Sequence, residues 1–144
     1  MTKRIILDEK ERVGEWVSSR TNRHAPWANY EAIGIEKDGE LIAGTVFDGY
    51  VENARCSMHI ATAGPGSITR TYTWMCFDYV FNQLNCEVAI GLVDADNEAA
   101  LAFDKRLGFQ ELVRIPNGAG QCDLVVLTMP RKTCRWLNIK RVKK

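Results

Sequence analysis

The feature that most constrains the fold of this chain is a short, continuous apolar run over residues 88–93. A strand that is apolar at every position belongs in the middle of a sheet whose two faces are both covered. Helical patterns precede and follow it, over residues 69–84 and through residues 100–107, and Asp94 or Asp96 is the expected N-cap of the second helix. We therefore expect a sheet with helices packed against it and this run as a central strand.

The clearest turn signal in the chain is the pair Asp38 and Gly39. It separates two apolar runs, 32–35 and 41–47, and both residues tolerate the positive φ that a tight hairpin turn requires. A third run at 56–62 ends where glycine and proline break the strand pattern. These runs predict an antiparallel meander.

The remaining segments complete a single sheet. A short apolar run at 4–7 precedes a helical pattern, and two final strands, 109–115 and 122–129, flank a glycine-containing loop. The order β-α-β-β-β-α-β-α-β-β predicts a mixed α/β fold, one domain with a central mixed sheet of about seven strands. A chain of 144 residues suits one domain, which we place at residues 1–130, followed by a basic tail at residues 131–144.

Composition excludes several classes of protein. Hydrophobic residues make up 46% and charged residues 26%, which is typical of soluble globular chains and unlike disordered ones. No apolar run approaches the roughly 20 residues that span a bilayer, and the polar start lacks the apolar stretch of a signal peptide. The five cysteines lack metal-ligand spacing. We expect a cytoplasmic protein with no membrane partner, no metal and buried free thiols.

The formal net charge of +1 is a cancellation between two parts of the chain. Residues 131–144 contain seven basic residues and no acidic ones, so residues 1–130 carry 12 basic against 18 acidic residues. Such a tail is compatible with a nucleic-acid or acidic partner, and equally with solvated terminal charges. An acidic body suits an amine substrate, which arrives as a cation.

A glycine-containing turn, residues 63–66, leads into the long helix that begins near Arg70. The unpaired amides and the dipole at a helix N-terminus attract phosphate, and an arginine in the first turn adds a charged fork. The pattern also fits glycines that serve only to turn the chain.

The segment of residues 97–109 resembles the Asn-x-x-Ala-x-x-φ-x-x-Lys/Arg-φ-Gly-Phe segment of the GCN5-related N-acetyltransferase (GNAT) superfamily, where φ in the motif stands for an apolar residue. The hairpin around Asp38 is similar to the second and third strands of that family. The resemblance covers roughly residues 33–129, and the order of elements agrees. It implies a fold in which two parallel central strands splay apart and acetyl-coenzyme A lies in the gap.

The same resemblance implies a set of cofactor residues. The pantetheine arm would pair with main chain near Ile60 and Ala61, and Asn97 and Phe103 would face the cofactor. Arg106 would meet its 3′-phosphate or, alternatively, stabilise the end of its own helix. The pyrophosphate would rest on the loop of Gly66, Ser67, Ile68, Thr69 and Arg70.

Two departures from the family pattern concern charge and proton transfer. The glycine loop has no basic residue at its first position, and Arg70 is the candidate to replace that charge. Asp104 stands where many members have a tyrosine that acts as general acid, so no side chain is identified as the proton donor, and solvent is the candidate for that role.

The candidate general base is His59, on the strand beside the expected pantetheine, because histidine titrates near neutral pH. The alternative is a structural histidine with a satisfied ring. Asp48 and Glu52, near the end of the preceding strand, are weaker candidates, and with Trp27 and Tyr30 they are assigned to the acceptor side.

The leading hypothesis is an N-acetyltransferase that moves an acetyl group from acetyl-coenzyme A to a primary amine by direct transfer in a ternary complex. The acceptor would be a small molecule or a protein amine, and the enzyme a monomer or homodimer. One alternative is a catalytically inactive GNAT-like binding protein. Another is a member that the basic tail directs to nucleic acid.

Overall fold

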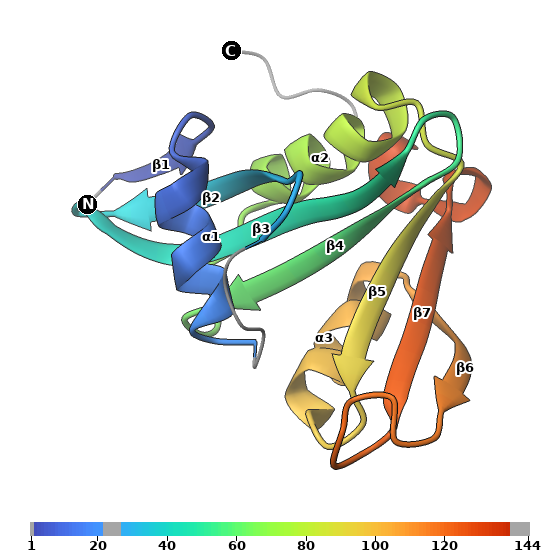
Figure 1. The fold of residues 1–144 in the computed structure, drawn as a ribbon. Coiled ribbons are helices and arrows are strands. Elements are labelled where there is room, and N and C mark those ends of the chain that lie inside the picture. Colours follow the sequence, from blue (N-terminus) through green and yellow to red (C-terminus); the bar gives the residue numbers. More distant parts are fainter. Residues whose placement is uncertain (1, 22–26, 139–144) are drawn as a thin grey trace.

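In the described part of the chain, residues 2–21 and 27–138, seven strands and three α-helices follow one another in the predicted order. The structure is a computed structural model, drawn as a ribbon in Figure 1. The elements are β1 (Lys3–Ile6), α1 (Lys10–Ser18), β2 (Glu31–Lys37), β3 (Glu40–Val51), β4 (Arg55–Thr62), α2 (Arg70–Asp78), β5 (Val88–Asp94), α3 (Glu98–Leu107), β6 (Gln110–Ile115) and β7 (Leu124–Pro130). A π-helical turn, Tyr79–Gln83, continues α2, and 3₁₀ turns at Arg131–Thr133 and Arg135–Asn138 follow β7.

The strands form one mixed sheet in the order β1-β2-β3-β4-β5-β7-β6. Neighbouring strands are antiparallel, except that β4 and β5 are parallel. The first four strands are the predicted meander, and Asp38 and Gly39 make its first turn with φ values of 55° and 85°. The predicted sheet and hairpin are confirmed.

The two parallel strands part soon after they meet (Figure 1). Their pairing runs only from Arg55 opposite Val88 to Ser57 opposite Ile90, although β4 continues to Thr62. Beyond this point the edge of β4 that faces away from β3 therefore lies along a gap rather than a neighbouring strand. The splayed central strands that the family resemblance implied are confirmed.

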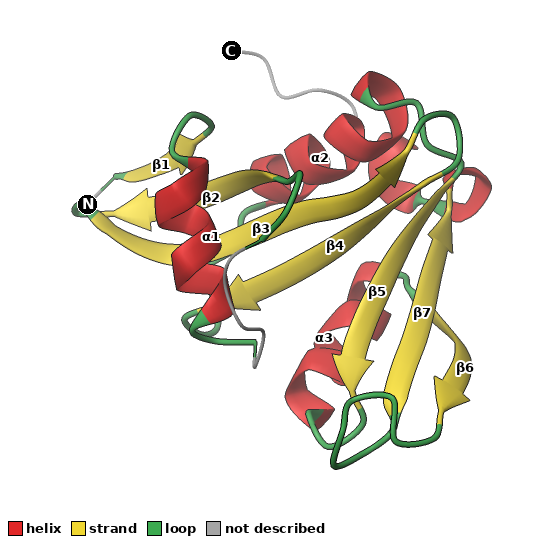
Figure 2. Ribbon diagram, in the orientation of Figure 1, coloured by secondary structure: helices red, strands yellow, loops and turns green. Residues whose placement is uncertain are grey.

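Helices cover the two faces of the sheet unequally (Figure 2). Val13 and Val17 of α1 pack on one face with Val46 and Ala61 of the sheet. The apolar residues of α2 and α3 pack on the other face, in the larger core cluster. Because α2 and α3 lie on the same side, the described helices cover the second half of the sheet on one face only.

This arrangement corrects the expectation that β5 is covered on both faces. Ala89 and Val93 are buried, whereas Ile90 and Leu92, on the opposite face, are only half-buried. The run is apolar at every position, but both crossover helices pack on the same side of it. The opposite face stays partly open to solvent.

Two features of α3 fix its ends. Asn97 is the N-cap, with its side-chain oxygen accepting a hydrogen bond from the amide of Ala100 at 3.1 Å, so the expected cap at Asp94 or Asp96 is wrong. Gly108 ends the helix with φ 119°, in the left-handed region that glycine favours.

The described beginning of the basic tail packs on the domain. Cys134 is buried, and the ring of Trp136 stacks on Phe77 with centroids 6.5 Å apart. The indole N–H of Trp136 donates to the carbonyl of Leu107 at 2.8 Å. Residues 139–144, with four of the seven basic residues on which the nucleic-acid hypothesis rests, lie outside the described residues.

The expectation about thiols also agrees with the structure. All five cysteines are free, and four are buried, with Cys122 half-buried. None of the described helices is both long enough and apolar enough to span a bilayer.

Candidate active site

The parting of β4 and β5 opens a groove of about 840 Å³ between the end of β4, the start of α2 and one side of α3. Nearly all the residues that the family resemblance assigned to the cofactor come together here. Those that line the groove are Ile60, Ala61, Gly66, Ile68, Thr69, Arg70, Asn97, Phe103 and Arg106. Ser67 does not line it: this residue is buried, and its amide donates to the carbonyl of Gly64 at 3.3 Å.

The glycine-containing loop ends in a capped helix that points at the groove. Gly66 has φ 81°, and a Cβ there would meet no atom within 4 Å. Thr69 is the N-cap of α2, and its hydroxyl accepts from the amide of Tyr72 at 3.1 Å. The first amides of a helix have no partner within the helix, so this end presents donors and a positive dipole to a ligand in the groove.

The groove is strongly basic. Among the described residues that line it are four arginines, Arg20, Arg70, Arg106 and Arg135, and no aspartate or glutamate. The Arg20 guanidinium stacks on the ring of Trp16 at 4.4 Å, and the Arg135 guanidinium donates to the carbonyl of Arg106. In a body with an excess of acidic residues, this concentration of guanidinium groups makes an anion site.

Two of these arginines were missed in the sequence. Arg20 follows α1 in a segment without periodicity, and Arg135 was counted only as part of the tail. Only the folded chain brings them beside Arg70 and Arg106.

His59 and Asp48 form a hydrogen-bonded pair on the α1 face of the sheet. Nε2 of His59 lies 2.8 Å from Oδ1 of Asp48, and His59 is only 6% exposed. The strand register places Val46 opposite His59 and Asp48 opposite Ser57, so the two side chains are diagonal neighbours on one face. The ring of Trp27 covers His59 with centroids 4.9 Å apart.

The pair has the arrangement of an oriented base. The carboxylate accepts the proton on Nε2 and so fixes the tautomer in which Nδ1 carries the lone pair. The described residues form no hydrogen bond to Nδ1. His59 does not line the basic groove, but the next two residues of β4, Ile60 and Ala61, do. The pair and the groove are therefore presented by the same strand.

Of the other acceptor-side residues, Trp27 lies against this pair, whereas Tyr30 and Glu52 do not. Tyr30 lines a separate hollow near Glu31 and Tyr50, with the Lys10 ammonium 5.1 Å from its ring centroid. Glu52 is exposed in the turn between β3 and β4.

Asp104 lies on the side of α3 that faces the sheet rather than the groove. It is 8% exposed, and a Cβ on Gly91 of β5 would lie 3.2 Å from its Oδ2 atom. Burial away from water raises the pKa of Asp104 to about 7. In this orientation it does not point where a proton donor in the groove would be needed.

Within the described residues, one grouping of potential metal ligands occurs, formed by Asp94, Asp96 and Cys122. Their ligand atoms all lie within 4.8 Å of one another. Surface carboxylates commonly gather without a metal, so the expectation of no metal remains a prediction.

No protein-family model matches the sequence. No curated protein matches it either.

Solved structures of low sequence identity share its fold. A probable acetyltransferase is 19% identical with a TM-score of 0.66, over 90% of this chain and 93% of that one. A chimera of the spermidine N-acetyltransferase SpeG from Vibrio cholerae and hSSAT is 17% identical with a TM-score of 0.72, over 96% and 98%. SpeG from the same organism in complex with manganese ions is 16% identical with a TM-score of 0.69, over 95% of each chain. The GNAT fold that the resemblance implied is confirmed.

Proposed function

We propose that this protein is an N-acetyltransferase that transfers an acetyl group from acetyl-coenzyme A to a primary amine in a ternary complex. The observation that carries the proposal is the groove where β4 and β5 part, basic along its walls and beside the His59–Asp48 pair. Acetyl-coenzyme A has the matching chemistry, with phosphates at one end and a thioester at the other.

The residues present fit the donor. Arg70 and the start of α2 would hold the pyrophosphate, because guanidinium groups and helix amides both bind phosphate oxygens. Unpaired backbone groups of β4 would bind the amides of the pantetheine arm, as an added strand does. Phe103 and Ile60 supply apolar contact, and Arg106 or Arg135 would meet the remaining phosphate.

When bound, the donor supplies the thioester carbonyl that the amine attacks. An ammonium ion must first lose a proton, and Nδ1 of His59 would take it directly or through one water molecule. Asp48 would stabilise the imidazolium that results. Attack by the amine would form the C–N bond and break the C–S bond. The new amide nitrogen would release its second proton to solvent, and the thiolate would take a proton from solvent, because Asp104 faces away from the groove.

The acceptor is proposed as a primary amine in a small molecule or protein. One argument is the acidic body, which attracts cations over a distance. Another is that solved structures with the same fold include a spermidine N-acetyltransferase.

The first test is calorimetric titration with acetyl-coenzyme A. We expect saturable binding that Arg70→Ala weakens by roughly 10- to 100-fold, because a hydrogen bond to a charged group contributes about 1.5 to 3 kcal/mol. Arg55→Ala is the matched control, since Arg55 is exposed on β4 and does not line the groove. A folded protein that does not bind would favour the inactive interaction protein, and an equal loss in both variants would place the phosphates elsewhere.

A second arm tests the base by measuring thiol release with a panel of primary amines. His59→Gln should lower kcat by roughly 10²- to 10⁴-fold, the usual contribution of a general base, without changing affinity for acetyl-coenzyme A. Asp48→Asn should produce a smaller loss. An unchanged rate and pH profile in His59→Gln would remove His59 from the mechanism while leaving the donor site intact.

A further inference from the structure

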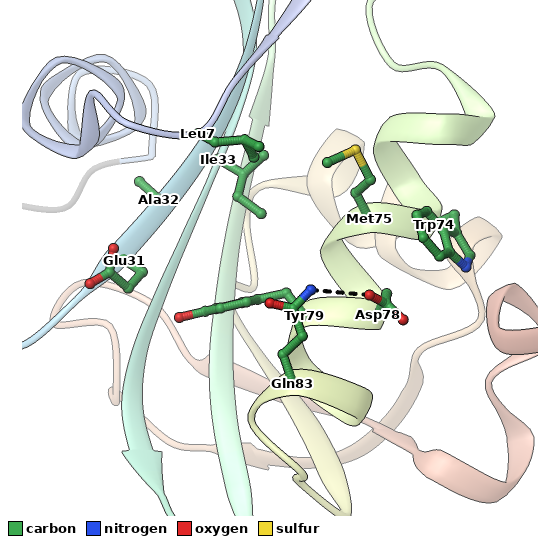
Figure 3. Close-up of a pocket in the computed structure, with 9 residues that line it drawn as sticks. All are labelled: Leu7, Glu31, Ala32, Ile33, Trp74, Met75, Asp78, Tyr79 and Gln83. Carbon is green, nitrogen blue, oxygen red and sulfur yellow. Dashed lines mark hydrogen bonds between the residues drawn. The ribbon is translucent and has the colours of Figure 1, made fainter. Parts of the chain in front are cut away.

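A second hollow lies between the start of β2 and the junction of α2 with its π-helical turn (Figure 3). Its volume is about 370 Å³, and it shares no lining residue with the basic groove. Two carboxylates, from Glu31 and Asp78, line it together with the aromatic rings of Trp74 and Tyr79. The hollow is therefore acidic, whereas the groove is basic.

Asp78 is the buried charge of this site. It is 8% exposed, and among the described residues its carboxylate accepts hydrogen bonds from two neutral side-chain amides, Asn82 at 2.8 Å and Gln83 at 3.1 Å. Both donors belong to the π-helical turn, which fixes the carboxylate in the wall of the hollow. No lysine or arginine of the described residues forms an ion pair with it. A carboxylate oxygen that accepts one hydrogen bond keeps capacity for another.

Glu31 adds a second negative charge at a more open position. Its side chain is 58% exposed, and the Lys10 ammonium lies 3.8 Å away, at the long end of ion-pair distances. A pair this exposed contributes little and can be exchanged for another cation.

The aromatic and apolar side chains that line the hollow also favour an organic cation. Figure 3 shows the Tyr79 ring reaching across from the helix toward the strand that carries Glu31. Burial, and then the charge of Glu31, raise the pKa of Tyr79 to about 12, so the phenol is neutral at physiological pH. Met75 and Ile33 add apolar surface between the rings. Aromatic faces next to carboxylates attract an organic cation in preference to a hydrated metal ion.

We infer that this hollow binds a primary alkylammonium ion, with the ammonium group at Asp78 and the alkyl chain along Met75 and the two aromatic rings. An ammonium with three N–H donors matches the open acceptor positions of the carboxylates. A quaternary ammonium would leave them unpaired, and a neutral chain would leave the charge of Asp78 uncompensated. The site is separate from the acceptor position proposed beside His59, so a ligand here is not placed for acetylation.

The test uses n-hexylammonium as the probe and n-hexanol as its neutral counterpart, with calorimetry on the 144-residue chain. We expect saturable binding of the ammonium ion. Hexanol should bind at least about tenfold more weakly. Glu31→Gln and Asp78→Asn should each weaken ammonium binding, Asp78→Asn by at least about tenfold. If Asp78→Asn fails to fold, the exposed Glu31→Gln still decides the case, because unchanged affinity in that variant overturns the inference.

Tryptophan fluorescence locates the ligand. The wild type should change its emission on titration with hexylammonium, and Trp74→Phe should lose that change while Trp16, Trp27 and Trp136 remain. Persistence of the full change in Trp74→Phe would place the ligand elsewhere. His59→Gln should bind the probe as the wild type does. Loss of binding in His59→Gln would instead assign the ligand to the acceptor site and overturn the inference, without bearing on acetyl-coenzyme A.

Discussion

Asp104 illustrates how one side chain couples the stability of this protein to pH. It is a carboxyl group on α3 that is buried against β5, and desolvation raises its pKa from 3.8 to about 7. Between about pH 4 and pH 7 the folded state therefore keeps the carboxyl proton of Asp104, whereas the unfolded chain has released it. In that range the free energy of unfolding falls as pH rises.

Asp104→Asn should abolish this dependence. The neutral amide has nearly the same shape and carries no charge to desolvate. Near pH 4 the variant and the wild type should have similar free energies of unfolding. As the pH rises to about 7, the variant should become progressively more stable than the wild type. A pKa change of this size corresponds to at most about 4 kcal/mol at pH 8.

Urea unfolding between pH 4 and 8 measures the difference. Asp8→Asn provides the matched control, because Asp8 is exposed. Parallel stability curves for wild type and Asp104→Asn across this range would show that the carboxyl group of Asp104 is already solvated or paired.

Sequence patterns could name several site residues but not how they pair. His59 and Asp48 were both candidates, yet their hydrogen bond depends on the strand register, which shifts between Asp48 and Val51. An irregularity of that kind leaves no clear mark in the sequence. Asp104 was likewise located by its motif, whereas the direction of its side chain follows from how α3 rests on the sheet.

Among the elements, α1 has the closest contact with the sheet. Gly34 of β2 and Gly44 of β3 stand opposite each other beneath it. A Cβ on Gly44 would lie 2.9 Å from Cγ2 of Val17 and 3.0 Å from Cγ1 of Val13. These glycines therefore allow the helix to approach. Trp27, which covers His59, donates its indole N–H to the carbonyl of Gly14 in α1, so the position of this helix also affects the proposed base.

Gly44→Ala should destabilise the protein by about 1 to 3 kcal/mol, the usual cost of an added methyl group in a packed core. Urea unfolding measures this cost. In a double-mutant cycle, Val17→Ala should recover part of it, because the smaller side chain leaves room for the new methyl group. Strict additivity of the two changes would show that α1 is not held at this distance by the glycine contact.

At the scale of elements, prediction succeeded where the signal is local. The hairpin at Asp38 and the order of strands and helices follow from turn chemistry and periodicity, and both are confirmed. The π-helical turn at residues 79–83 was not predicted, because its apolar pattern continues that of α2. The open face of β5 was also not predicted, since periodicity does not tell on which side of a sheet a crossover helix packs.

The formal net charge of the whole molecule does not predict the local charge of the groove. The basic groove collects arginines from four distant parts of the chain, and one of them, Arg135, belongs to the segment first interpreted as a tail. Within that segment Cys134 is buried, and Arg131 donates to the carbonyl of Cys86 at 3.0 Å. The end of the described chain therefore contributes to both the core and the groove.

Two truncations separate these roles. A chain that ends at Pro130 loses the buried Cys134, the stacked Trp136 and the contacts of Arg131, and we expect the free energy of unfolding to fall by about 3 to 5 kcal/mol, as for loss of a large core side chain. It also lacks Arg135, so affinity for acetyl-coenzyme A should fall even at temperatures where it stays folded. A chain that ends at Asn138 keeps every described contact and should match the 144-residue chain in both measurements. Thermal unfolding and calorimetric titration of the three proteins make the comparison. Equal stability of both truncated chains would mean that residues 131–138 add nothing to the core. Loss of acetyl-coenzyme A binding in the chain that ends at Asn138 would instead assign a phosphate contact to residues 139–144.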